Sequence, residues 1–165
     1  MIRLLMILTY IAGGVGVAVG FYLLGRGSGH GEDALIAVTI GFCVLMGGLS
    51  WVRHFLLWRA DEKFLGVHDA TPFFHWEVGF ANGAFALAGF LAVIFAWGVA
   101  ALAAVVLCYA VYLLQAAVMH GWRYFSGQSR TPQRLWGSFI GLLAICVMVI
   151  VIVAMALGDA GIRPF

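Results

Sequence analysis

The chain has 165 residues, of which 64% are hydrophobic and 10% are charged, and its mean hydropathy is +1.06. A soluble domain carries roughly 25% charged residues, so this composition excludes a water-soluble globule and predicts one compact domain, residues 1–165, in lipid. The net charge of +2 is small, which argues against a nucleic-acid partner.

Apolar stretches follow one another along the chain, and each is long enough to cross about 30 Å of hydrocarbon as a helix. A lone strand would leave its backbone groups unpaired in lipid, so helix is the expected state of every stretch. The fold class predicted is therefore an all-α integral membrane bundle of five transmembrane helices. They run approximately over residues 2–25, 34–58, 74–97, 99–120 and 135–158.

Lysine and arginine collect on one side of this predicted bundle. The N-terminus and the loops 59–72 and 121–134 share a side and hold seven cations, against two on the other side. Because cytoplasmic loops carry the excess of basic residues, we expect a multi-pass protein of the inner (plasma) membrane with its N-terminus in the cytoplasm. The seven are Arg3, Arg53, Arg59, Lys63, Arg123, Arg130 and Arg134, and the two are Arg26 and Arg163.

Three polar residues from three helices are predicted to lie at one depth. The third and fourth stretches turn near Gly98, with Glu77 lying 21 residues before the turn and His120 lying 22 residues after it. His54 lies 20 residues beyond the start of the second stretch, so it reaches the same level near the cytoplasmic face. A carboxylate in hydrocarbon costs about 2.5–3.5 kcal/mol, so Glu77 is expected to face the bundle interior and to have partners.

Several kinds of chemistry fit this plane of residues. Two imidazoles and a carboxylate suit a transition metal, with His54, Glu77 and His120 as ligands. A b-type haem held by His54 and His120 is a second hypothesis. A proton or quinone site with Glu77 as the titrating group is a third. A structural network of these groups with nearby arginines would need no cofactor.

The remaining polar residues carry less information. Asn82 and Gln115 lie deeper in their helices and are expected to hydrogen-bond to a neighbouring helix. His68 and His75 are expected at the membrane interface, and His30 on the outer loop. The sequence holds no nucleophile elbow, P-loop, HExxH motif or paired-cysteine site, so no enzyme class is indicated.

The middle of the chain resembles a known group of proteins. EVGFAN (77–82) opens one span after a short TPF connection, YLLQAAVMH (112–120) closes the next span, and His54 lies near the end of the span before. Over about residues 51–120 this pattern resembles an uncharacterised family of small bacterial multi-pass membrane proteins. The resemblance implies a grouping of His54, Glu77, Asn82 and His120, and it implies no activity. The basic loop 121–134 does not match the pattern.

Two functions of different classes follow. The first is a small integral-membrane protein that binds a transition metal or a haem at a His/Glu site near the cytoplasmic face. The alternative is a non-catalytic accessory or scaffold subunit of a larger membrane complex. Its partners would be the lipid bilayer and other subunits, or a second copy of the chain.

Overall fold

Five spans make up nearly the whole chain. The computed structural model describes residues 1–65, 72–127 and 130–162, and every regular element among them is a helix. Within these described ranges, five helices are long and apolar enough to cross a membrane, which confirms the predicted fold class. The side of the membrane on which the N-terminus lies stays a prediction. The spans are Ile2–Leu24, Gly31–Leu56, Phe73–Ile94, Val99–Phe125 and Arg134–Asp159.

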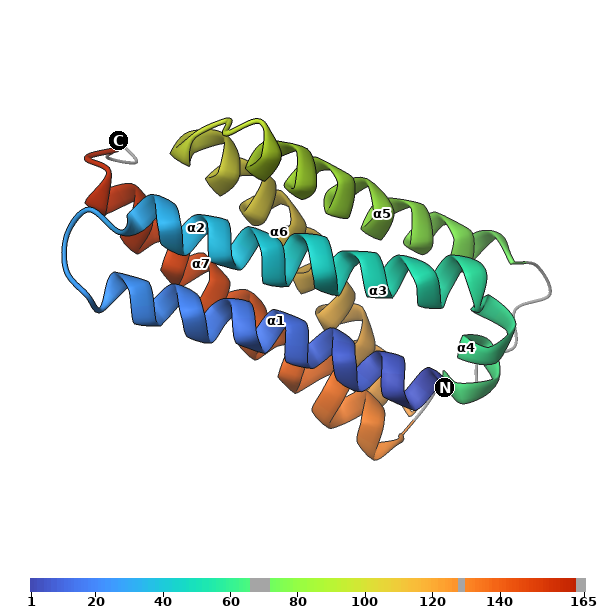
Figure 1. Cartoon of the computed structure of the whole chain (residues 1–165). Coiled ribbons are helices and arrows are strands. Elements are labelled where there is room, and N and C mark those ends of the chain that lie inside the picture. Colours follow the sequence, from blue (N-terminus) through green and yellow to red (C-terminus); the bar gives the residue numbers. More distant parts are fainter. Residues whose placement is uncertain (66–71, 128–129, 163–165) are drawn as a thin grey trace.

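Several spans consist of shorter helical pieces, of which Figure 1 labels the α-helical ones. The first, third and fourth spans are α1 (Ile2–Leu24), α5 (Phe73–Ile94) and α6 (Val99–Phe125). The second span is continuous and consists of α2 (Gly31–Val38), η1 (Thr39–Met46), α3 (Gly47–Trp51) and η2 (Val52–Leu56). The fifth consists of η3 (Gln133–Gly141) and α7 (Leu142–Asp159). A short helix, α4 (Trp58–Leu65), follows the second span where the sequence predicts a loop.

The three segments labelled η are π-helical. In a π-helix each amide donates to the carbonyl five residues earlier, so the helix is wider than an α-helix. Its side chains therefore lie on other faces than they would in an α-helix. In the second span, η1 and η2 together interrupt the regular α geometry on which the sequence-based depths rest. Arg53 and His54 lie within η2.

The second span is the central one, because its segments contact all four other spans. Its side chains Leu35, Val38 and Phe42 are fully buried. Phe42 packs against Tyr109 of α6, with the two ring centroids 5.0 Å apart. The apolar core therefore lies along the second span, while the outward faces of the other helices present exposed hydrophobic side chains, as lipid-facing helices do.

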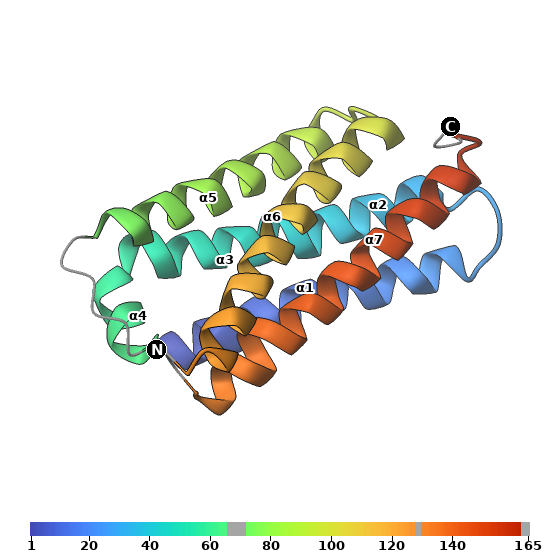
Figure 2. The ribbon, with the colours of Figure 1, turned by 180° about the vertical axis from the view of Figure 1, so that it is seen from behind.

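The third and fourth spans diverge from the turn that joins them. Ala96 and Gly98 have φ of +47° and +82°, which end α5 and start α6 in the opposite direction. Both views show α5 and α6 close together at this turn and far apart at their other ends (Figures 1 and 2). α5 packs mainly on η1, α3 and η2, whereas α6 packs mainly on α7 and η3. Residues of α5 and α6 therefore contact each other on the side of the turn, as Asn82 and Tyr109 do, whereas the far ends of the two helices lie apart.

The end of the bundle that holds this turn is also tied together by a carboxylate. Gly29 and Gly31, between the first and second spans, both donate their backbone amides to Asp159, at 2.8–2.9 Å. Asp159 is the last residue of α7. The contact joins segments about 130 residues apart in the sequence and fixes the first loop against the fifth span.

Two backbones touch where α1 crosses η1. A Cβ atom added at Gly41 would lie 2.6 Å from the Cα atom of Gly16 and 2.8 Å from the carbonyl oxygen of Ala12. Glycine at both positions allows a close helix crossing of the kind that membrane proteins favour. Gly48 lies in the same span, and a Cβ there would meet nothing within 4 Å.

Gly41→Ala is therefore expected to lower the free energy of unfolding by about 1–3 kcal/mol, because α1 and η1 must separate to admit the methyl group. Gly48→Ala is the matched control and is expected to raise it by up to about 1 kcal/mol, because the added methyl group meets no neighbour and alanine favours a helix more than glycine does. Reversible denaturation in mixed micelles measures both. Equal stability of the two variants would contradict the close crossing.

Candidate functional site

A buried carboxylate stands at the other end of the bundle. The second span ends at Leu57, where the backbone leaves helical geometry, and α4 then turns toward the start of α1 (Figure 1). Arg3 lies 5.8 Å over the ring of Phe64, which fixes α4 against that helix. This placement buries Asp61 completely, at 0% exposed, against η2 and α5.

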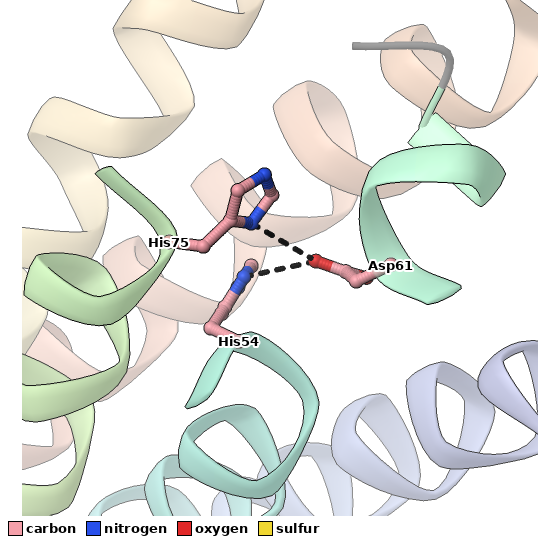
Figure 3. Close-up of side chains that lie close together, drawn as sticks. All are labelled: His54, Asp61 and His75. Carbon is pink, nitrogen blue, oxygen red and sulfur yellow. Dashed lines mark ion pairs between the residues drawn. The ribbon is translucent and has the colours of Figure 1, made fainter. Parts of the chain in front are cut away.

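Three cationic or titratable side chains surround the Asp61 carboxylate. Arg53 Nε lies 3.1 Å from its Oδ1 atom. The Nδ1 atoms of His54 and His75 lie 2.9 Å and 3.9 Å from its Oδ2 atom. Figure 3 shows both imidazoles directed at this one oxygen, from η2 and α5, with Asp61 reaching in from α4. The carboxylate thus has one oxygen beside a guanidinium and the other beside two imidazoles.

The geometry of this cluster leaves its nitrogen and oxygen atoms poorly satisfied. Within the described residues, both Asp61 oxygens, His54 Nδ1 and both ring nitrogens of His75 are buried without an aligned hydrogen bond. His75 is 2% exposed, so water reaches it little. Buried polar atoms normally have partners. One ligand atom from each of His54, Asp61 and His75 lies within 4.8 Å of the others, so the three atoms are close enough to contact one metal ion.

His54 is held on both sides of its ring. Arg53 Nη2 donates to His54 Nε2 at 2.8 Å, so that nitrogen is the acceptor in this arrangement. A neutral imidazole then carries its proton on Nδ1, on the side of Asp61. Arg53 therefore orients His54 and compensates the Asp61 charge at the same time.

The faces of α5 explain which of its polar residues belongs to the site. Residues two apart lie about 200° apart around an α-helix, so His75 and Glu77 face opposite sides. His75 shares its face with Gly79 and Asn82, which are also buried. Glu77 shares its face with the exposed Phe80. The expectation that Glu77 faces the interior is wrong, because its side chain is exposed.

The predicted site residues are thus only partly brought together. His54 and His120 line one cavity, and Glu77 is not among the residues that line it. Binding by the set His54, Glu77 and His120 stays a prediction, as does a haem held by the two histidines. His68 lies outside the described residues.

Two polar residues predicted to bond between helices have different outcomes. Tyr109 on α6 donates its hydroxyl to Asn82 Oδ1 at 2.6 Å, and Asn82 Nδ2 donates to the carbonyl oxygen of Val78 at 2.7 Å. The prediction for Asn82 is therefore confirmed. Gln115 is exposed, and its side chain makes no hydrogen bond within the described part of the chain.

The sequence does not predict Asp61 or His75 as residues of the site. Asp61 lies in the predicted loop 59–72, and His75 is predicted at the membrane interface. A usable signal did exist for His75: His75, Gly79, Asn82 and Gly89 recur at helical spacing and mark the packed face of α5. No comparable signal exists for Asp61, because its burial depends on how α4 turns.

Comparison with protein families shows to which family the chain belongs. A model of a family of unknown function, DUF6790, matches residues 6–160. The chain belongs to this family. No curated protein and no solved structure matches it. Membership of the DUF6790 family agrees with the resemblance to an uncharacterised family, while EVGFAN as its signature and a bacterial source stay predictions.

The charges around Asp61 set its titration. Burial raises the pKa of the Asp61 carboxyl, but the nearby His54 nitrogen and the Arg53 guanidinium lower it more, so the pKa lies below its ordinary value of 3.8. Asp61 lies in α4, outside the five spans. A depressed pKa in the folded state means that the ionised carboxylate stabilises the fold above the ordinary pKa, and that this stabilisation is lost as the pH falls through the folded pKa.

Asp61→Asn is expected to lower the free energy of unfolding at pH 7 by about 3–5 kcal/mol, because Arg53 loses its buried counter-charge. The wild type is expected to lose stability below about pH 4, and the variant to lack this part of the acid dependence. Denaturation in mixed micelles between about pH 3 and about pH 7 measures both effects.

Asp33→Asn is the matched control for this variant. Asp33 pairs with His30 at 3.3 Å, but its side chain is 60% exposed. We expect a change within about 0.5 kcal/mol for such a surface pair. The ion-pair assignment is contradicted if the Asp61 and Asp33 variants lose equally little stability.

Proposed function

We propose that this protein is a multi-pass membrane protein that binds one transition-metal ion through His54, Asp61 and His75. The observation that carries the proposal is the convergence of three ligand atoms within 4.8 Å, all of them buried. Two imidazole nitrogens and one carboxylate oxygen suit zinc, iron or manganese.

The states of His75 and Asp61 support binding by this set, whereas His54 must change its hydrogen bonding. His75 needs no rearrangement of partners, because neither ring nitrogen has an aligned hydrogen bond within the described residues. Asp61 offers Oδ2 while Oδ1 stays beside Arg53. A metal on His54 Nδ1 requires the ring proton to sit on Nε2, so metal binding would break the hydrogen bond from Arg53. Arg53 is therefore expected to compete with the metal.

The surroundings of the cluster bear on what the metal would do. His54 and His75 line a cavity, whereas Asp61 is not among its lining residues. A structural zinc site normally has four protein ligands, and a site with three keeps a position open to water or another molecule. Three ligands beside a cavity therefore favour an exchangeable or reactive metal over a purely structural one.

We further propose that the end of the bundle with this site faces the cytoplasm, in the inner membrane. Arg53, Arg123 and Arg134 all line the cavity at this end, in agreement with the excess of basic residues there. The alternative role, a non-catalytic accessory subunit, stays a prediction.

Metal content tests the proposal directly. Protein purified in mild detergent, and reloaded separately with Zn²⁺, Mn²⁺ and Fe²⁺, is expected to hold about one metal ion per chain by elemental analysis. His75→Leu replaces the imidazole by an apolar side chain of similar size, so the variant is expected to fold and to lose the metal. Gel filtration and circular dichroism check that it folds.

Matched variants separate this ligand set from the one that the sequence suggested. Glu77→Gln and His120→Leu are expected to retain the metal, while Asp61→Asn and His75→Leu are expected to lose it. The opposite pattern would favour the set His54, Glu77 and His120. A wild-type protein that holds no metal after all three loadings would overturn metal binding, and a Soret band would favour haem.

A further inference from the structure

A cavity of about 310 Å³ occupies the end of the bundle next to Asp61, and side chains from all five spans line it. The apolar part of its wall includes Met46 and Val78. Its polar part includes three arginines, Arg53, Arg123 and Arg134. A cavity that combines apolar walls with cations is suited to an amphiphile that carries negative charge.

The positive charge in this cavity is only partly compensated. No carboxylate is among the residues that line it. Arg53 forms an ion pair with Asp61. Arg123 and Arg134 form no ion pair with a carboxylate in the described part of the chain. Arg134 is nevertheless 5% exposed. These two guanidinium groups therefore have no carboxylate partner within the described residues, and an anion in the cavity would supply the missing counter-charge.

A second polar group in the cavity also lacks a partner. His120 Nδ1 is buried, and no aligned hydrogen bond reaches it within the described residues. His120 lies on α6 one turn before Arg123. Guanidinium groups match the geometry of phosphate oxygens through paired N–H donors, and an imidazole N–H adds one more donor. A phosphate group, with several acceptor oxygens, suits these three donors.

Exposed side chains of two helices take part in lining the cavity. They are Phe74, Gln115 and Met119. Phe74 belongs to α5 and the other two to α6, the helices that separate widely at this end (Figure 2). Aqueous ions would approach from the end of the bundle, whereas a molecule that already lies in the membrane approaches from the side.

We propose that this cavity binds the phosphate group of an anionic membrane lipid, which enters between α5 and α6, and that Arg123 and Arg134 hold the phosphate. The acyl chains would remain outside, against the exposed apolar side chains of the two helices. The proposal does not rest on metal binding, because neither arginine belongs to the cluster around Asp61.

Binding of short-chain lipids to the full-length protein in mild detergent tests the proposal. Phosphatidic acid and phosphatidylglycerol are the probes, with zwitterionic phosphatidylcholine and inorganic phosphate as comparisons. The anionic lipids are expected to bind at least about tenfold more tightly than the others. Arg123→Gln and Arg134→Gln are each expected to weaken this binding about tenfold, since a charge-assisted contact is lost.

Arg130→Gln is the matched control, because Arg130 is exposed beyond α6 and does not line the cavity. It is expected to bind the lipids like the wild type. If a glutamine variant fails to fold, Arg134→Lys replaces it, and weaker binding with the charge retained is expected because the forked donor is lost.

Three results would overturn the proposal. The first is equal binding by the Arg130 and Arg134 variants. The second is equal affinity for phosphatidylcholine and the anionic lipids. The third is inorganic phosphate binding as tightly as the lipids, which would make the cavity a site for small aqueous anions. Lipid binding that persists when His75→Leu has lost its metal would show that the phosphate site does not require the metal.

Discussion

The buried ion pair between Asp61 and Arg53 determines how one end of the bundle is built. Neither charge is stable alone in this environment, so η2 and α4 must stay together for as long as both are ionised. His54 and His75 take their positions from the same carboxylate. The candidate metal centre, the turn of α4 and one wall of the cavity therefore share a single electrostatic origin.

Hydropathy was enough to predict the five spans, because a helix in lipid must satisfy its own backbone and the apolar runs are long. The assignment of His54 to the polar end also followed from its distance along the span. Glu77 was misplaced because depth alone does not determine which face of a helix a residue occupies. The π-helical segments, the turn of α4 and the divergence of α5 from α6 depend on packing between distant residues, so no local pattern in the sequence indicated them.

The candidate metal centre and the cavity adjoin but differ in character. His54 and His75 belong to both, since they contact Asp61 and also line the cavity. Arg123 and Arg134 belong to the cavity alone. A metal ion would add positive charge beside a cavity that already contains three arginines, and an anion there would offset it. Occupancy of one site is therefore expected to favour occupancy of the other.

The contact of Asp159 with Gly29 and Gly31 has a consequence for the order in which the protein is made. The two glycines are synthesised about 130 residues before their acceptor, Asp159. Until Asp159 has been synthesised, the first loop lacks this contact. The loop becomes fixed only when the fifth span has entered the membrane, so a chain that stops before this helix leaves its first hairpin untethered.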